Sequence, residues 1–210
     1  VTVTITEPEF GLDLEGEVFS YQGEFGVSCF GESDGSIELN PIGGTTPYSY
    51  LWSNGDTIQD LDNLEAGEYS VVVTDANLCQ DSLTFTVSSP DLLVVAETHS
   101  DYQTWGVECN GDENGFINID VAGGTGNGTY TYNWSSGQDF EDINNLAPGN
   151  YTLVVTDLNL CADSVTVTIT EPPLLEISET YSDYNGEGVS VSYTHLRANE
   201  TRHDLVCRLL

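Results

Sequence analysis

The chain has 210 residues, with 35 acidic residues against three basic ones, and its formal net charge is −32 at pH 7. A surface this acidic repels nucleic-acid phosphates and anionic lipid head groups, so we expect no nucleic acid among the partners. No hydrophobic stretch of the sequence is long enough to cross a bilayer, so we expect no membrane insertion of this segment.

The first eight residues recur later in the chain. Residues 1–8 (VTVTITEP) are identical to residues 165–172. Tandem copies of a domain-sized unit repeat their elements in the same order. We therefore predict that residues 1–8 are the last strand of a preceding repeat.

Residues 9–90 and 91–172 are two copies of one unit. Such copies usually build length or avidity rather than an active site. Each copy has a cysteine, a Gly-Gly-Thr turn, a tryptophan, a Val-Thr-Asp triplet and a second cysteine. These features lie at Cys29, 43–45, Trp52, 73–75 and Cys79, and again at Cys109, 123–125, Trp134, 155–157 and Cys161.

Apolar and polar residues alternate within each copy, which is the period of a β-strand. Turn signals such as Asn54-Gly55 separate the runs. The pattern predicts an all-β fold of tandem immunoglobulin-like antiparallel β-sandwich repeats. The stripe of Tyr48, Tyr50 and Trp52, like that of residues 130, 132 and 134, is interpreted as the inward face of a sandwich. An exposed platform for sugar rings is the alternative.

A glycine precedes a tyrosine at the start of a late strand, in the run Leu64-x-Ala66-Gly67-x-Tyr69. This run resembles a tyrosine corner, in which the phenol bonds back to the backbone. It supports the sandwich prediction without indicating one particular function.

A third copy begins after Pro172, because residues 181–184 echo residues 99–102. A cysteine is due at position 191, where Val191 stands, and the chain's three basic residues, Arg197, Arg202 and Arg208, all follow. We interpret residues 173–191 as the start of a third repeat. Residues 192–210 resemble translated sequencing-adapter read-through and are excluded from the fold as an artefactual tail. The alternative is a basic C-terminal helix.

The two cysteines of each copy are candidates for a disulfide. A small all-β unit with matched cysteines is typical of proteins outside the reducing cytosol. We predict the pairs Cys29–Cys79 and Cys109–Cys161. The alternatives are a zinc site, which would need closer ligand spacing and more histidines, and a catalytic thiol, which would need a matched histidine.

Four loop aspartates are candidate calcium ligands: Asp34, Asp75, Asp112 and Asp157. Carboxylate and carbonyl oxygens are the ligands that Ca²⁺ prefers, and we expect the sandwich to bring these loops together beside the disulfide. The sequence has no EF-hand spacing, and aspartates are common in exposed turns. We otherwise expect no cofactor. Acidic residues are too abundant for a glycosidase pair to stand out, so no enzyme is predicted.

The ordered motifs of the first copy resemble those of a known family. Cys-x-Gly-x-x-x-Gly-Ser-Ile begins at Cys29, Gly-Gly-Thr-x-Pro-Tyr-x-Tyr-x-Trp-Ser-Asn-Gly at Gly43, and Val-Thr-Asp-Ala-Asn-x-Cys at Val73. Together they resemble the SprB-type repeat of very large cell-surface adhesins in gliding Bacteroidota, over residues 1–190. Leu78 and Leu160 depart from the pattern, because the family usually has glycine before the second cysteine. The resemblance implies secretion, surface display and adhesion.

The leading hypothesis is therefore a non-enzymatic repeat segment of a secreted cell-surface adhesin, acting in adhesion or gliding motility. The expected location is extracellular, at the cell surface. The expected partners are neighbouring repeats of the same chain and a surface polysaccharide or other extracellular ligand. The alternative is a carbohydrate-binding accessory module of a secreted polysaccharide hydrolase. An open aromatic patch would favour this alternative, and a buried stripe the adhesin.

Overall fold

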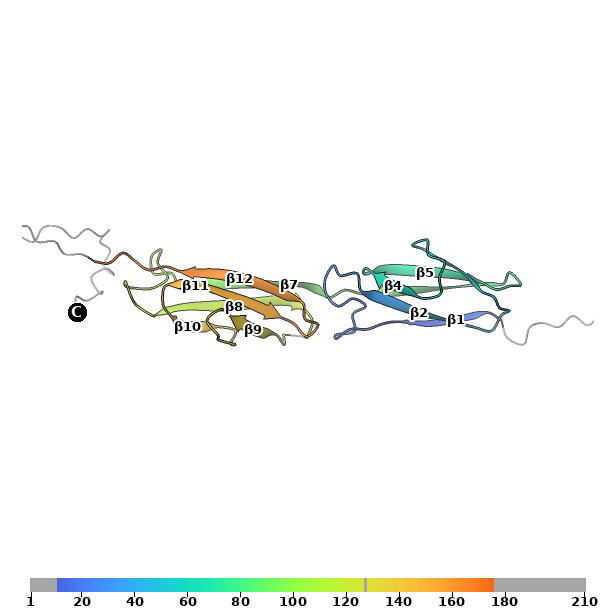
Figure 1. Ribbon diagram of the computed structural model, residues 1–210, viewed down its shortest axis with the longest axis horizontal. Coiled ribbons are helices and arrows are strands. Elements are labelled where there is room, and N and C mark those ends of the chain that lie inside the picture. Colours follow the sequence, from blue (N-terminus) through green and yellow to red (C-terminus); the bar gives the residue numbers. More distant parts are fainter. Residues whose placement is uncertain (1–10, 127, 176–210) are drawn as a thin grey trace, which may run out of the picture. The chain divides into compact units, whose positions relative to one another are not determined.

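The computed structural model describes residues 11–126 and 128–175. These residues form twelve β-strands and no helix (Figure 1). The predicted strand at residues 1–8, most of the predicted third repeat and the predicted artefactual tail lie outside the described residues. The predicted boundaries at residues 90 and 172 stay predictions.

The first six strands form two three-stranded sheets. One sheet has the order β1-β2-β4, and the other has the order β3-β5-β6. Neighbouring strands in both sheets pair antiparallel. The strand bounds are β1 (Asp13–Val18), β2 (Gly35–Ile42), β3 (Ser49–Trp52), β4 (Leu61–Leu64), β5 (Gly67–Thr74) and β6 (Gln80–Val87).

The last six strands repeat this arrangement. One sheet has the order β10-β8-β7 and the other the order β12-β11-β9. A Cβ added to Gly115 of β8 would lie 3.0 Å from Cγ2 of Ile169 in β12, so these two sheets face each other closely. The strand bounds are β7 (Asp91–His99), β8 (Gly115–Gly124), β9 (Thr131–Trp134), β10 (Ile143–Leu146), β11 (Gly149–Thr156) and β12 (Ala162–Ile169).

This strand order is that of an immunoglobulin-like sandwich. β1, β2 and β4 take the places of strands A, B and E, and β3, β5 and β6 those of strands C, F and G. The predicted tyrosine corner at Tyr69 is present, and the second copy has its counterpart at Tyr151. The Tyr69 hydroxyl donates to the Glu65 carbonyl at 3.0 Å, and the Tyr151 hydroxyl to the Ala147 carbonyl at 2.9 Å. The predicted fold class is confirmed.

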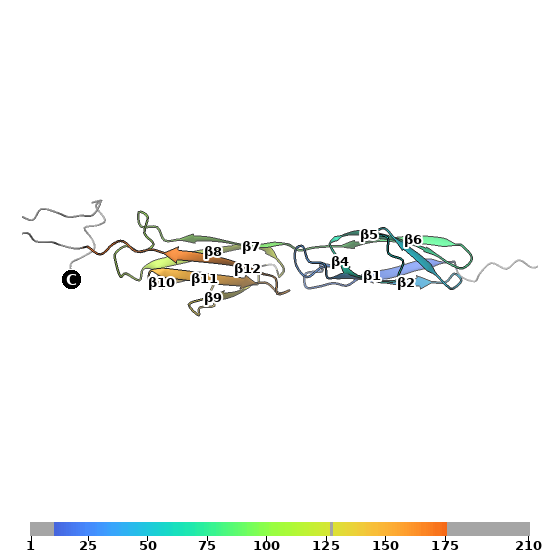
Figure 2. The same ribbon diagram turned by 45° about the horizontal axis from the view of Figure 1, so that its top comes forward.

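The core of the first sandwich lies between its two sheets, with β5 and β6 on one side and β1 and β2 on the other (Figure 2). Trp52 is only 2% exposed, and its indole N–H donates to the Ile58 carbonyl at 2.8 Å. Tyr48 and Tyr50 are half-buried and pack against the same core. The stripe therefore faces inward, as predicted, and the reading of it as an exposed sugar platform is wrong.

The second copy repeats this arrangement around its own tryptophan. Trp134 is 2% exposed, and its indole N–H donates to the Phe140 carbonyl at 2.9 Å. Alternate residues of β8, β11 and β12 are buried in this core, as the period-two pattern predicts: Ile117, Leu153, Val155, Val167 and Ile169.

The chain divides into two compact units. The first contains the residues up to Val95 together with Val121–Thr131 and Val155–Asp163. The second contains Ala96–Asp120, Tyr132–Val154 and the residues from Ser164 onward. The first unit thus holds β1–β6, the first part of β7 and two further segments of the second sequence copy, which include the ends of β8 and β11. A helix capable of crossing a membrane is not found in the described part of the chain.

Candidate functional site

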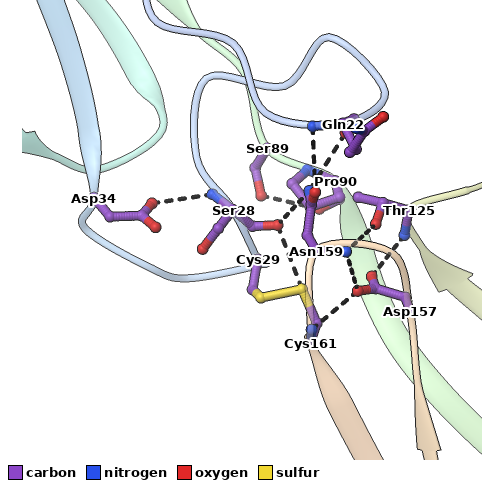
Figure 3. Close-up of a disulfide and its surroundings, with 10 residues drawn as sticks. All are labelled: Gln22, Ser28, Cys29, Asp34, Ser89, Pro90, Thr125, Asp157, Asn159 and Cys161. Carbon is purple, nitrogen blue, oxygen red and sulfur yellow. Dashed lines mark hydrogen bonds between the residues drawn. A yellow bond between two sulfur atoms is a disulfide. The ribbon is translucent and has the colours of Figure 1, made fainter.

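A disulfide in the first compact unit joins the two sequence copies (Figure 3). Cys29 lies in the loop between β1 and β2, and Cys161 is the residue directly before β12. Their Cα atoms are 5.7 Å apart, although 132 residues separate them in the sequence. This disulfide was not among the predicted pairs.

The predicted pairs Cys29–Cys79 and Cys109–Cys161 are both wrong. Cys161 is bonded to Cys29, and Cys79 is an exposed free thiol. Cys109 takes part in a disulfide as well. One cysteine pair per copy therefore does not mean one disulfide within each copy.

Strand geometry explains why Cys29 and Cys79 cannot meet. The amides of Gly26 and Val27, just before Cys29, donate to the Ser88 carbonyl, which follows the end of β6. Cys79 instead directly precedes the start of β6. The eight residues of β6 span about 25 Å, whereas disulfide-bonded Cα atoms are usually no more than about 7 Å apart. The two cysteines thus lie at opposite ends of the first sandwich.

The same argument applies to Cys109 and Cys161. The amides of Gly106 and Val107, just before Cys109, donate to the carbonyl of Thr170, which follows the end of β12. Cys161 precedes the start of that strand. The length of β12 again separates the two cysteines of one copy.

A buried aspartate organises the hairpin that presents Cys161. The side chain of Asp157 is 4% exposed and accepts three backbone hydrogen bonds. The donors are the amides of Thr125 at 2.7 Å, Asn159 at 2.9 Å and Cys161 at 2.9 Å (Figure 3). These bonds fix the turn between β11 and β12 and hold the cysteine at its tip.

Asn159 connects this hairpin to the loop that carries Cys29. Its side-chain N–H₂ donates to the Ser28 carbonyl at 3.0 Å and to the Gln22 carbonyl at 3.3 Å, and its side-chain oxygen accepts from the Gln22 amide at 3.2 Å. In addition, the Cys161 sulfur lies 3.3 Å from the Ser28 carbonyl. Figure 3 shows these contacts beside the disulfide. The junction therefore combines one covalent bond with a polar contact set.

The first copy contains the same hairpin without a bonded partner. Asp75 is also 4% exposed and accepts the amides of Thr45 at 2.9 Å, Asn77 at 2.8 Å and Cys79 at 2.8 Å. Burial by itself would raise the pKa of Asp75, but the hydrogen bonds from Cys79, Thr45 and Asn77 outweigh it and lower the pKa. The carboxylate thus acts as an acceptor that shapes the loop.

The predicted meeting of Asp34 with Asp75 is wrong. Asp34 directly precedes β2, at the end of the sandwich where a Cβ on Gly35 would touch Val87. Asp75 follows Thr74, which pairs with Gln80 at the other end of the β5–β6 ladder. The two carboxylates are therefore a strand length apart, and their second-copy counterparts, Asp112 and Asp157, belong to different compact units.

Asp34 and Asp112 also serve as acceptors for loop backbone. Asp34 accepts the Ser28 amide at 3.0 Å, and Asp112 accepts the Cys109 amide at 3.0 Å. Burial would raise the pKa of Asp34, but hydrogen bonds from Ser28 and Tyr21 lower it below its ordinary value. Residues 11–126 and 128–175 contain no cluster of three or more His, Cys, Asp or Glu side chains arranged to hold a metal ion. Calcium binding stays an untested expectation.

Sequence reasoning missed the polar residues of the junction. Asn159 and Thr125 have counterparts at Asn77 and Thr45, so the repeat itself carried a signal. The repeat did not identify the partners of Asn159, because Gln22 and Ser28 belong to a loop more than a hundred residues away in the sequence. Only the folded chain brings these segments together.

A comparison with protein-family models matches two segments of the chain, residues 27–57 and 107–139, to the SprB repeat. Each of the two sequence copies therefore contains a segment similar to the SprB repeat. Each matched segment begins just before the first cysteine of a copy and extends past its core tryptophan, at Trp52 or Trp134. The resemblance seen in the sequence is therefore confirmed.

Among solved structures, the amphioxus IgVJ-C2 molecule is similar at 16% identity and a TM-score of 0.30, with 74% of this chain and 96% of that chain covered. The immunoglobulin-like assignment here depends instead on the strand order and the two tyrosine corners. The search of curated proteins gives no match.

SprB repeats and a disulfide together indicate a segment of a cell-surface protein. Disulfides persist in oxidising compartments outside the cytosol, which agrees with an extracellular location. The repeat and its sandwich fold indicate a structural repeat domain rather than an enzyme.

Proposed function

We propose that this chain is a non-enzymatic, load-bearing segment of a secreted cell-surface adhesin. The observation that carries the proposal is the presence of two SprB repeats in tandem. Its work is mechanical: it carries tension between the cell and a binding region elsewhere in the adhesin. Gliding motility and attachment to surfaces are the processes in which such tension arises.

The disulfide supports a mechanical role. Tension applied to the two ends of the described chain reaches Cys29 from one side and Cys161 from the other. The covalent bond between them carries the force past the intervening residues. Those 132 residues of sequence separation correspond to roughly 450 Å of extended chain that cannot be pulled out. A segment protected in this way resists lengthening even if its sandwiches lose their packing.

The partners that fit this role are neighbouring repeats and an extracellular ligand such as a surface polysaccharide. The strongly acidic composition argues against nucleic acid and anionic membranes as partners. The inward-facing Tyr48, Tyr50 and Trp52 stripe is committed to the core, so it offers no sugar platform. This disfavours a carbohydrate-binding accessory module.

Single-molecule stretching tests the load-bearing role. The full chain is held through handles fused to its two ends, and the wild type is compared with Cys29→Ser and Cys161→Ser. Because Cys109 also takes part in a disulfide, all the proteins compared carry Cys109→Ser as well, and each variant is then expected to release about 450 Å more contour length than its disulfide-bonded parent. Cys79→Ser keeps the disulfide and serves as the matched control, with wild-type behaviour expected. Equal extension of all four proteins would contradict a disulfide-protected stalk.

Two further measurements test the adhesin assignment itself. Antibodies raised against the chain should label intact cells that produce it, and in-frame deletion of the segment should reduce attachment to surfaces. Binding of the purified chain to insoluble polysaccharides, with no loss of attachment on deletion, would favour the accessory module instead.

A further inference from the structure

The hairpin around Cys79 has the same aspartate-centred hydrogen bonds as the hairpin whose cysteine is bonded to Cys29. The Asp75 amide donates to the Cys79 carbonyl at 2.9 Å, and the Asp157 amide to the Cys161 carbonyl at 3.0 Å. Leu78 has a φ of 66°, and Leu160 has a φ of 69°. With the three amide bonds accepted by each aspartate, the two loops share one conformation.

The two hairpins differ in what covers them. Cys161 and Asn159 are half-buried beneath the loop of Gln22 and Ser28, whereas Cys79 and Asn77 are exposed. The Asn77 side-chain N–H₂ donates to the Thr45 hydroxyl at 2.9 Å, within its own copy. The first copy thus displays a preformed docking conformation with its contact residues uncovered.

We propose that the Cys79 hairpin is a docking surface for the cysteine loop of a further SprB repeat. In this arrangement Cys79 forms a disulfide with that repeat's equivalent of Cys29. Asn77 bonds the two loop carbonyls that correspond to Ser28 and Gln22. The inference depends on the geometry of the Cys29–Cys161 junction and is independent of the adhesin role.

The occupant follows from the chemistry of the occupied copy. Asn159 recognises two backbone carbonyls and one amide in a loop whose end is a cysteine, and the disulfide then locks the contact. The free Cys79 and the neighbouring Asn77 therefore fit the same kind of partner, a loop that ends in a cysteine. The second cysteine of one repeat therefore pairs with the first cysteine of another, and a row of repeats becomes linked unit to unit.

The bond forms by ordinary thiol–disulfide exchange. The Cys79 thiolate attacks oxidised glutathione or another disulfide oxidant and releases one thiolate. The partner's cysteine thiolate then attacks the Cys79 sulfur and releases the second thiol. Two thiols lose two protons and two electrons in total, and the oxidant accepts them as two reduced thiols.

The test mixes two forms of the full chain in a glutathione redox buffer. The donor is the wild type, with Cys79 free. The acceptor is the Cys79→Ser/Cys161→Ser double variant, in which Cys29 has lost its partner. We expect a covalent heterodimer whose non-reducing peptide map contains Cys79 joined to Cys29. A Cys79→Ser donor should give none.

Two controls separate docking from the reactivity of any exposed thiol. A Cys29→Ser/Cys79→Ser acceptor presents Cys161, which belongs to the same hairpin type as the donor, and it should give far less heterodimer. An Asn77→Ala donor should lower the yield at least about fivefold, the factor that corresponds to the loss of one net hydrogen bond. An acceptor that had merely unfolded would react equally with the wild-type donor and with the Asn77→Ala donor. Equal heterodimer yields from the two acceptors, or from the wild-type and Asn77→Ala donors, would overturn the proposal. So would a reaction that gives only glutathione adducts and Cys79–Cys79 dimers.

Discussion

Single residues at the tips of the β5–β6 and β11–β12 hairpins have conformations that their side chains do not favour. Leu78 and Leu160 both lie in the left-handed region and are 80% and 81% exposed. These are the positions where the SprB pattern usually has glycine. The hydrogen bonds of Asp75 and Asp157 hold the turn in place in spite of the leucine, so the departure from the pattern leaves the turn intact.

Replacing Leu78 with glycine should stabilise the protein. The left-handed conformation costs an L-residue about 1–2 kcal/mol, while the greater freedom of glycine in the unfolded chain costs ~0.5–1 kcal/mol. The expected net gain is up to about 1.5 kcal/mol in the free energy of unfolding, measured by urea denaturation. Leu51→Gly, at an exposed position inside β3, is the matched control and should be destabilising. A loss of stability in both variants would refute the strain argument.

The Asp75 carboxylate should make stability depend on pH. Its pKa is lowered in the fold, so its contribution is present above the ordinary aspartate pKa of about 3.9 and is lost as pH falls through the folded pKa. Asp75→Asn should therefore have a lower melting temperature than the wild type at pH 7. The side-chain NH₂ of the new asparagine would face a backbone N–H that donates to Asp75 in the wild type. The difference should shrink below about pH 4. Glu68→Gln, exposed on β5, removes the same charge and should follow the wild-type pH profile.

At the scale of elements, the pairing of β5 with β6 determines which loops meet. Their ladder runs from Gly67 opposite Val87 to Thr74 opposite Gln80. One end therefore carries the tyrosine corner and the loop of Cys29, and the other carries the Cys79 hairpin. The two ends of each sandwich differ in chemistry, which suits one end to present a hairpin and the other to receive one.

The tyrosine corner should contribute measurably to the first sandwich. Tyr69→Phe removes the bond to the Glu65 carbonyl and keeps the ring, so a loss of about 0.5–1.5 kcal/mol is expected in the free energy of unfolding. The equivalent change Tyr151→Phe should cost a similar amount, since its bond to Ala147 is 2.9 Å long. Chemical denaturation of both variants provides the comparison. If neither variant loses stability, the corner is a conformational feature without a net energetic contribution.

The whole molecule is dominated by like charge. With 35 acidic residues and three basic ones, self-repulsion opposes the folded state and weakens as salt screens it. The Debye length falls from ~30 Å at 0.01 M to ~8 Å at physiological ionic strength. The melting temperature should therefore rise as NaCl is added.

Calcium at equal ionic strength distinguishes screening from specific binding. The carboxylates of Asp75 and Asp157 already accept three amides each, so we expect CaCl₂ to shift the melting temperature no more than NaCl does. A larger, saturable shift with Ca²⁺ would reveal a specific site through binding linkage. Asp75→Asn and Asp157→Asn would then show which hairpin binds the ion.

The sequence by itself determined the repeat, the strand pattern, the inward Tyr/Trp stripe and the tyrosine corners. Each of these depends on local periodicity or on a short motif, such as the Gly67-x-Tyr69 run. Only the tertiary structure decided how the cysteines and aspartates are grouped. Two copies with equal spacing are compatible with pairing within a copy or between copies. The choice follows from the length of β6, which places Cys29 and Cys79 at opposite ends of one sandwich, and from the fold that brings Cys161 beside Cys29.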